Sequence, residues 1–344
     1  MPIRLGTNLK KVYLFLSLVF CLVIGNYLVA SKNTVKSESK SSLIYQNDKP
    51  NKVTEDIRAL YKQKAKEGRT ATLEQKRIEI EKQIVPTPSN IKIKGETIEG
   101  TKVEWLIPDK SPEDKIVFYV HGGGWSRGGL GYSRNLGTIL ARETGYRVLT
   151  IQYRLSPENP FPAGLTDAEK IYSSLVKKIG PKSKVVIVGD SAGGNLTFAL
   201  LNQLKTLNGK YPSAVVGISP ATDLTKESQL YTSDFDSIHA NYHGNDINIV
   251  DTYVGNNDRK NPLISPLYGD LKGLPPMLIH AGAREELLDD ILAYAAEANF
   301  QGVEVTCKVW RGMFHDFQLM DKASPISKQA NTEIAQFIKQ QLGT

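Results

Sequence analysis

Cysteine is scarce in this chain of 344 residues, which contains only Cys21 and Cys307. Cys21 lies in an apolar N-terminal run, so the rest of the chain has one thiol and no partner for an internal disulfide. Cys307 alternates with Val303, Val305 and Val309, a pattern that predicts a buried strand position. The cysteine content therefore excludes a small domain held together by disulfides.

Common metal-binding and phosphate-binding patterns are missing as well. The sequence has no CxxC and no HExxH spacing, and its glycine run Gly122–Gly124 does not fit a phosphate loop. It also has no internal repeat. We therefore expect neither a metal ion nor a cofactor.

Positive charge is concentrated at one end of the chain. The net charge is +7, but residues 1–85 hold sixteen Lys and Arg against eight Asp and Glu, whereas residues 86–344 hold twenty-seven against twenty-eight. The larger part of the chain is thus about neutral. The charge distribution does not indicate a nucleic-acid partner.

The one long apolar run extends from Val12 to Ala30 and follows three basic residues. As a helix it would be about 28 Å long, close to the thickness of a bilayer core. Cleavage after Ala30 would need a small residue where the chain has Leu28, so the segment is suited to stay as an anchor. We expect residues 1–30 to be an export signal or a membrane anchor. The protein would then be exported, either anchored facing outward or periplasmic or secreted.

The rest of the chain predicts a linker and one large domain. Residues 31–50 are rich in Ser, Lys and Asn and predict a flexible tether. Residues 51–85 predict one or two amphipathic helices, and Ile91–Pro108 predicts a strand pair with period-two alternation. Strands and helices then alternate to Leu342. Residues 51–344 therefore predict an α/β domain whose mainly parallel sheet carries helices on both faces.

The residues around Ser191 form the pattern of a nucleophile elbow. The apolar run Val185–Val188 predicts a buried strand, Gly189–Gly193 has the G-x-S-x-G spacing, and Ala192–Leu207 predicts a helix. The two glycines let neighbouring backbones approach a serine held on a strained turn. We expect Ser191 to be a catalytic nucleophile.

A second glycine-rich turn lies about seventy residues upstream, where the buried-strand run Ile116–Val120 leads into His121-Gly-Gly-Gly-Trp125. Consecutive glycines after a strand expose backbone N–H groups, which a developing oxyanion requires. This turn and the elbow occur in the chain order of an α/β-hydrolase. We expect the N–H groups of Gly123, Gly124 and Ala192 to form an oxyanion hole.

With these two motifs the chain resembles the hormone-sensitive-lipase-like esterases of bacteria, a branch of the α/β-hydrolase superfamily. The resemblance covers about residues 53–342 and includes five further motifs: Tyr153–Glu158, Pro160–Ala163, Ser219–Leu224, Ser265–Leu267 and Gly312–His315. It implies an α/β-hydrolase fold with a mostly parallel central sheet and helices on both faces. It also implies a helical cap over the active site, here about residues 51–85 and 225–262.

A serine nucleophile needs a general base, and the chain order of this fold places that base downstream of the acid. Four of the five histidines fit other positions, upstream in the glycine turn, in a polar stretch or at a strand end: His121, His239, His243 and His280. His315 follows the last predicted strand and a turn, in a loop that can reach the elbow. We expect His315 to be the base.

The triad acid should follow the predicted strand Met277–Ala281. Asp289 and Asp290 precede a helical run, where carboxylates ordinarily stabilise the helix dipole. The family's acid stands two residues before a Leu-x-Asp-Asp pattern, so the resemblance implies Glu285. Glu286 and Asp289 stay open as alternatives.

These residues predict a serine hydrolase that cleaves small-molecule carboxylic esters with short to medium acyl chains through an acyl-enzyme. Trp125 and Asp190 are further candidates for the substrate pocket, although Trp125 equally fits a packing role. Two other classes stay open, a non-catalytic binding protein on the same fold and a serine peptidase of that fold. The sequence also leaves open whether the protein forms a homo-oligomer.

Overall fold

The computed structural model describes residues 41–46, 52, 55–56, 59, 71–82, 86–225, 249–320 and 324–343. All of them belong to one compact unit, residues 40–344. The predicted export segment, His239 and His243 lie outside the described residues. Within the described ranges, no helix has both the length and the apolar character needed to cross a bilayer.

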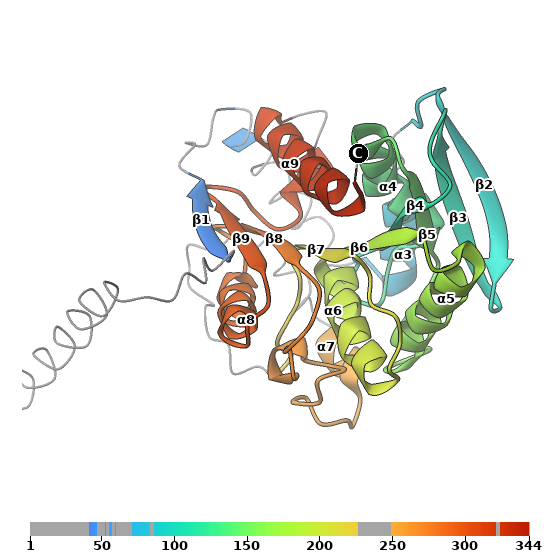
Figure 1. Cartoon of the computed structure of the whole chain (residues 1–344). Coiled ribbons are helices and arrows are strands. Elements are labelled where there is room, and N and C mark those ends of the chain that lie inside the picture. The colour runs from blue at the N-terminus through green and yellow to red at the C-terminus, as the bar shows by residue number, and fades with distance from the viewer. Residues whose placement is uncertain are drawn as a thin grey trace, which may run out of the picture. The chain divides into compact units, whose positions relative to one another are not determined.

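Nine strands in the described part of the chain form a single sheet in the order β1-β9-β8-β7-β6-β4-β5-β3-β2. Strand β3 pairs antiparallel with β2 and with β5, and every other neighbouring pair is parallel. The predicted mostly parallel sheet is therefore confirmed, as Figure 1 shows. The strands are β1 Ser42–Gln46, β2 Ile91–Ile98, β3 Thr101–Pro108, β4 Lys115–Val120, β5 Arg147–Ile151, β6 Lys184–Asp190, β7 Ala214–Ile218, β8 Met277–Gly282 and β9 Val305–Trp310.

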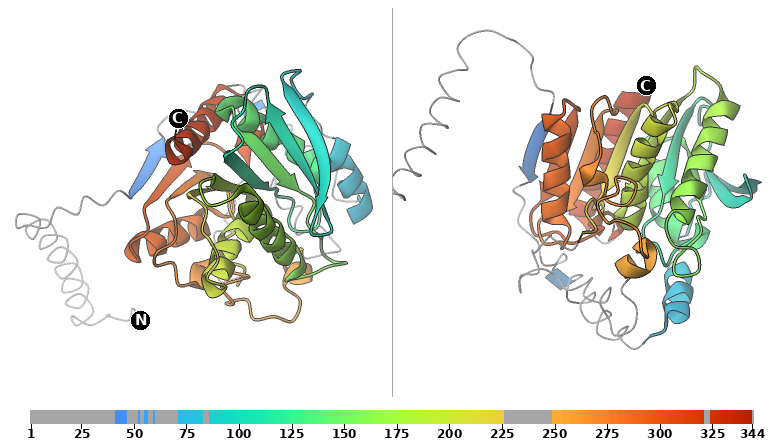
Figure 2. Two further views of the ribbon diagram at one scale, coloured as in Figure 1. Left: turned by 45° about the vertical axis from the view of Figure 1, so that its right-hand side comes forward. Right: turned by 90° about the horizontal axis from the view of Figure 1, so that it is seen from below.

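Helices cover both faces of this sheet (Figure 2), as predicted. On one face α4 and α9 pack over β4, β6 and β7, and on the other α5, α6 and α8 bury apolar side chains against the sheet. The described helices are α3 Leu73–Lys82, α4 Leu130–Thr144, α5 Ala163–Ile179, α6 Ser191–Thr206, α7 Ile249–Val254, α8 Leu288–Phe300 and α9 Pro325–Leu342, with short 3-10 helices η4 Pro266–Tyr268 and η5 Phe317–Met320.

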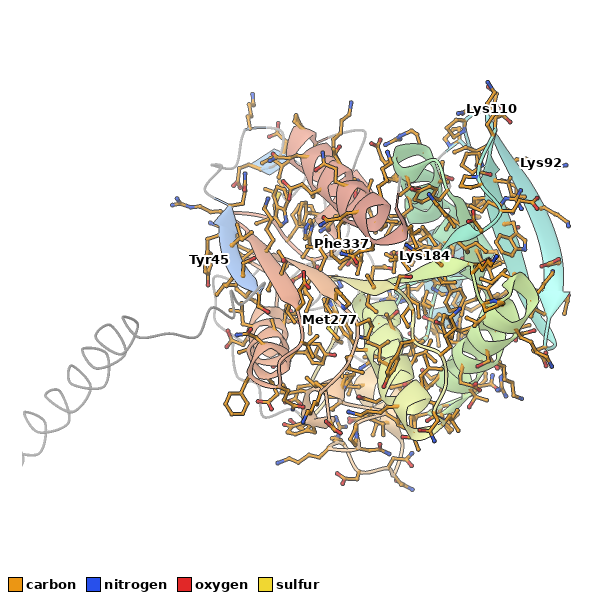
Figure 3. The ribbon with its side chains drawn as sticks, viewed as in Figure 1. Tyr45, Lys92, Lys110, Lys184, Met277 and Phe337 are labelled. Atoms are coloured by element: carbon orange, nitrogen blue, oxygen red, sulfur yellow. The ribbon has the colours of Figure 1, made fainter. Side chains whose placement is uncertain are left out.

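The inner strands are mostly apolar because both of their faces are covered. All five residues of β7 and all six of β8 are buried, and β6 is exposed only at Lys184, its first residue (Figure 3). Such strands read as continuous apolar runs rather than alternating ones. The predicted strand position of Cys307 is confirmed, since it lies on β9 and is 2% exposed. Burial raises the pKa of its thiol to about 12, so Cys307 is unreactive at neutral pH.

Two predictions for the N-terminal part are wrong. Residues 42–46 were predicted to belong to a flexible tether, but they form the edge strand β1, which pairs with β9 in parallel. The hydroxyl of Ser41 fixes the start of this pairing, because it donates to the carbonyl of Val303 and accepts from the N–H of Val305. Tyr45 lies on this edge, 58% exposed (Figure 3). Helix α3, predicted to be amphipathic, buries none of its residues.

The carboxyl ends of the parallel strands position the predicted site. The glycine turn follows β4, Ser191 follows β6, Glu285 follows β8 and His315 follows β9. Because these strands are neighbours in a parallel sheet, the loops after them emerge at the same edge. In open α/β sheets this edge is where ligands bind.

Candidate active site

Ser191 occupies a sharp turn between β6 and the first turn of α6. Its backbone has a φ of 50°, a left-handed conformation that is uncommon outside glycine. A Cβ on Gly189 would lie 2.4 Å from the carbonyl oxygen of Gly193, and a Cβ on Gly193 would lie 2.1 Å from that of Val120. Only glycine fits at either position. The turn therefore has the strained geometry that the G-x-S-x-G spacing predicts.

The structure brings His315 and Glu285 together in the loops after β9 and β8. The Nδ1 atom of His315 lies 3.2 Å from Oε2 of Glu285, and the side chains are 4% and 0% exposed. Glu286 is half-buried and Asp289 is exposed on α8, whereas the Glu285 carboxylate is buried against the imidazole. This geometry supports Glu285 among the candidates that the sequence left open.

Two of the other histidines occupy buried structural positions. His121 lies under the glycine turn, where its Nδ1 is 2.7 Å from the carbonyl oxygen of Gly122 and its ring stacks on Tyr153 at 4.4 Å. Burial lowers the pKa of His121 to about 4. His280 lies inside β8 against Trp310, and burial lowers its pKa to about 3. Both imidazoles are neutral at physiological pH and support the loops around them.

The glycine turn lies directly over the elbow. A Cβ on Gly122 would be 2.4 Å from Oδ2 of Asp190 and 3.1 Å from Cβ of Ser191, so the turn approaches the serine at backbone distance. Gly123 and Gly124 have φ values of 114° and 62°. Within the described residues, the N–H groups of these two glycines and of Ala192 donate no hydrogen bond to a carbonyl. These three N–H groups can therefore be offered to a bound oxyanion.

Asp190 and Trp125, which the sequence suggested for the substrate pocket, both lie in the interior. Oδ1 of Asp190 accepts hydrogen bonds from the Tyr119 hydroxyl at 2.8 Å and from the Gly122 N–H at 2.9 Å, and the residue is 0% exposed. Trp125 is 4% exposed, and its ring stacks on Tyr253 at 4.6 Å. Asp190 therefore lies beneath the glycine turn and supports it. Trp125 has the packing role that the sequence left open as its alternative.

Sequence reasoning missed two polar residues beside the imidazole. Oδ2 of Asp316 lies 3.1 Å from Nε2 of His315, the nitrogen that would face the serine. The Ser219 hydroxyl accepts a hydrogen bond from the Asp316 N–H at 3.2 Å and also helps to stabilise the Glu285 carboxylate. Because Asp316 directly follows the predicted base His315, the sequence alone could have indicated that its carboxylate lies near the imidazole. The role of Ser219 depends on a contact between loops after β7 and β9.

Two carboxylates contact the imidazole and raise its pKa. Burial by itself lowers the pKa of His315, but Asp316 and Glu285 outweigh it and raise that pKa well above its usual value. Burial raises the pKa of Glu285, and the imidazole counters this effect. Asp190 also has a raised pKa, first because it is buried and then because Asp316 is near. The contacts with Glu285 and Asp316 therefore favour the protonated form of His315.

Comparisons with known proteins agree with this fold. The profile of a family described as having the α/β-hydrolase fold matches residues 117–319. An acetyl-hydrolase from Streptomyces hygroscopicus is 33% identical over 247 residues, which are 72% of this chain and 82% of the relative. An esterase from Acinetobacter venetianus is 34% identical over 261 residues, 74% of this chain and 84% of the relative.

Solved structures of esterases and lipases share this fold. A hormone-sensitive lipase from a metagenome library superposes with a TM-score of 0.77 at 33% identity and covers 84% of this chain and 98% of its own. An esterase/lipase from an uncultured bacterium superposes with a TM-score of 0.79 at 29% identity and covers 86% of this chain and all of its own. The fold and these relatives define an α/β-hydrolase enzyme of the carboxylesterase class. Within that class, the chain belongs to the hormone-sensitive-lipase-like esterase family.

The carboxylate of Asp316 should set the pH dependence of activity. A general base acts in its neutral form, so kcat/KM is lost as pH falls through the pKa of His315. Asp316→Asn removes one of the two carboxylates that raise this pKa, and we expect the acidic limb of the profile to move to lower pH by about one unit. The measurement is kcat/KM against pH with a p-nitrophenyl ester.

Asp289→Asn is the matched control, because it removes an exposed carboxylate from the start of α8. Its acidic limb should coincide with that of the wild type. An Asp316→Asn profile that keeps the wild-type limb, or moves it to higher pH, would contradict this account of His315.

Proposed function

We propose that the enzyme cleaves carboxylic esters through a Ser191–His315–Glu285 triad and a covalent acyl-enzyme. The observation that carries the proposal is the buried contact between His315 and Glu285, 3.2 Å long, at the same sheet edge as the strained turn of Ser191. A base oriented by an acid, at the sheet edge that also carries a serine on a strained turn, is the arrangement that nucleophilic acyl transfer requires.

The proposed reaction uses the two nitrogens of His315 in turn. Nε2 accepts the proton of the Ser191 hydroxyl as the oxygen attacks the ester carbonyl, while Glu285 holds Nδ1–H and stabilises the imidazolium. The imidazolium then gives the proton to the departing alkoxide, and the acyl group stays on the serine. Water, deprotonated by the same nitrogen, hydrolyses the acyl-enzyme and restores the hydroxyl.

The oxyanion of each tetrahedral intermediate would be held by the N–H groups of Gly123, Gly124 and Ala192. Loss of one such donor costs about 3 kcal/mol of transition-state stabilisation. Ala192 lies in the first turn of α6, where unpaired N–H groups and the helix dipole favour negative charge. The fixed backbone makes these donors available without reorganisation during the reaction.

The names of the relatives support a broad substrate class, small-molecule esters. An acetyl-hydrolase and an esterase are each about one third identical to this chain over the aligned residues. These names support small esters with short to medium acyl chains over peptides or a purely binding role. The buried contact between His315 and Glu285, at the sheet edge that carries Ser191, is an arrangement that a non-catalytic binding protein would not need.

Ser191→Ala tests the proposal directly. Without the nucleophile, kcat on p-nitrophenyl esters should fall by several orders of magnitude while the protein stays folded, and a fluorophosphonate should label the wild type alone. Ser173→Ala, an exposed serine on α5, should change neither. Turnover or labelling that survives Ser191→Ala would remove the serine from the mechanism. A series of esters of increasing acyl length in the same assay ranks the chain lengths.

We further propose that residues 12–30 direct export and hold the enzyme at a membrane. The support is the apolar run after basic residues and the large Leu28 at the position where cleavage prefers a small side chain. The β1 strand begins at Ser42, so about a dozen residues would connect an anchor ending at Ala30 to the sheet. A catalytic unit attached in this way would work close to the bilayer surface.

Fractionation of cells that produce the full-length chain tests this proposal. A retained anchor predicts that the protein sediments with membranes and resists extraction by high salt and carbonate, because apolar burial is not screened by ions. A variant lacking residues 1–30 is the control and should be soluble. A cleaved signal would instead give a soluble exported form beginning near Ser31. Unprocessed full-length protein that is soluble in the cytoplasm would overturn the interpretation of this segment.

A further inference from the structure

Helix α3 contacts the active-site loops without burying an apolar surface. None of its ten residues is buried, and Ile78 is 48% exposed. The helix nevertheless packs against α4 (Figure 2), whose start follows the glycine turn. Two of its charged side chains, Arg77 and Glu81, form hydrogen bonds with the catalytic unit.

Arg77 binds three acceptors that belong to two active-site loops. Its Nε donates to the carbonyl oxygen of Ser126 at 2.7 Å, and its Nη2 donates to that of Ser156 at 2.9 Å. The same guanidinium forms a two-point ion pair with Glu158, at 2.7 Å from each carboxylate oxygen, and lowers the pKa of that carboxyl to about 2. A planar fork of donors is suited to such multiple contacts.

These acceptors are directly connected to the glycine turn. The N–H of Ser126 donates to the carbonyl of Gly123 at 3.3 Å, and the N–H of Ser156 donates to that of Trp125 at 2.8 Å. Arg77 therefore binds the carbonyl groups of Ser126 and Ser156, and the N–H groups of the same two residues bind carbonyl groups of the glycine turn and of Trp125. A shift of Ser126 or Ser156 would be transmitted to the peptide groups of Gly123 and Gly124.

Glu81 fixes the other end of the same segment. Its carboxylate accepts hydrogen bonds from the N–H groups of Gly131 at 3.0 Å and Tyr132 at 3.2 Å, in the first turn of α4. The N-cap residue of α4 is Gly129, which offers no side-chain oxygen, so Glu81 caps this helix from a different part of the chain. A Cβ on Gly131 would lie 2.5 Å from the carboxylate.

We propose that Arg77 and Glu81 are positioning residues for catalysis. They clamp the two ends of the segment from Ser126 to Tyr132, which directly follows Gly123 and Gly124, and through it they hold the N–H groups of these glycines where an oxyanion forms. This inference rests on the proposed function of those glycines. Since Arg77 and Glu158 are 27% and 57% exposed, the clamp is open to solvent and should weaken as salt is added.

The experiment compares Arg77→Ala and Glu81→Gln with two controls on the same helix. Lys82→Ala and Glu79→Gln remove exposed charges of the same signs from α3. For each clamp variant we expect kcat on a p-nitrophenyl ester to fall about tenfold to a hundredfold with KM nearly unchanged, because an oxyanion contact acts in the transition state. The controls should keep the wild-type kcat.

Salt and chemical rescue separate positioning from simple destabilisation. Screening shortens from about 10 Å at 0.1 M to about 3 Å at 1 M salt, so the wild-type kcat should fall over this range, whereas that of Arg77→Ala should not. Low concentrations of guanidinium ion should raise kcat of Arg77→Ala but not of the wild type. Circular dichroism verifies folding, and Arg77→Lys, with an intermediate kcat expected, serves if Arg77→Ala is unfolded.

A kcat for both clamp variants equal to that of the controls would overturn the proposal. So would a loss confined to KM, or a wild-type kcat that is insensitive to salt. The proposed function fails by a different result, namely turnover that survives Ser191→Ala. The two failures are therefore distinguishable in the same assay.

Discussion

The carboxylate of Asp190 is the contact on which the site depends. A single oxygen accepts hydrogen bonds from the Tyr119 hydroxyl on β4 and from the Gly122 N–H in the glycine turn, while the next residue in the chain is Ser191. One buried side chain thus fixes the relative positions of the strand, the turn and the nucleophile. Burial and the neighbouring Asp316 disfavour its charge, so we infer that Asp190 acts as a hydrogen-bond acceptor and not as an ion.

Around this fixed centre, charge is used in two different ways. Inside, Glu285 and Asp316 contact the two nitrogens of His315, so the imidazole is strongly biased toward its protonated form. Outside, Arg77 and Glu81 attach a helix that buries no residue of its own to the same loops. The inner charges are desolvated, and we propose that they control proton transfer; the outer ones are partly solvated, and we propose that they control geometry.

The sequence predicted the parts of the fold and site that are local in the chain. Continuous apolar runs identified the inner strands, and the elbow spacing identified the turn at Ser191, because both signals extend over only a few residues. It failed at β1, whose pairing with β9 joins residues more than 250 positions apart. It also gave no role to Arg77 or Ser219, since their contacts exist only after distant loops meet.

The central claim, that the acceptor oxygen of Asp190 couples the turn to the nucleophile, is tested most directly by kcat of Asp190→Asn and Asp190→Ala on one p-nitrophenyl ester. Asparagine keeps an oxygen at the Oδ1 position and carries no charge, so Asp190→Asn should retain most of kcat. Asp190→Ala removes the acceptor and should lower kcat by at least about tenfold in a folded protein, because the Gly122 N–H is then buried without a partner. Full activity in Asp190→Ala, or an equal loss in both variants, would contradict the account.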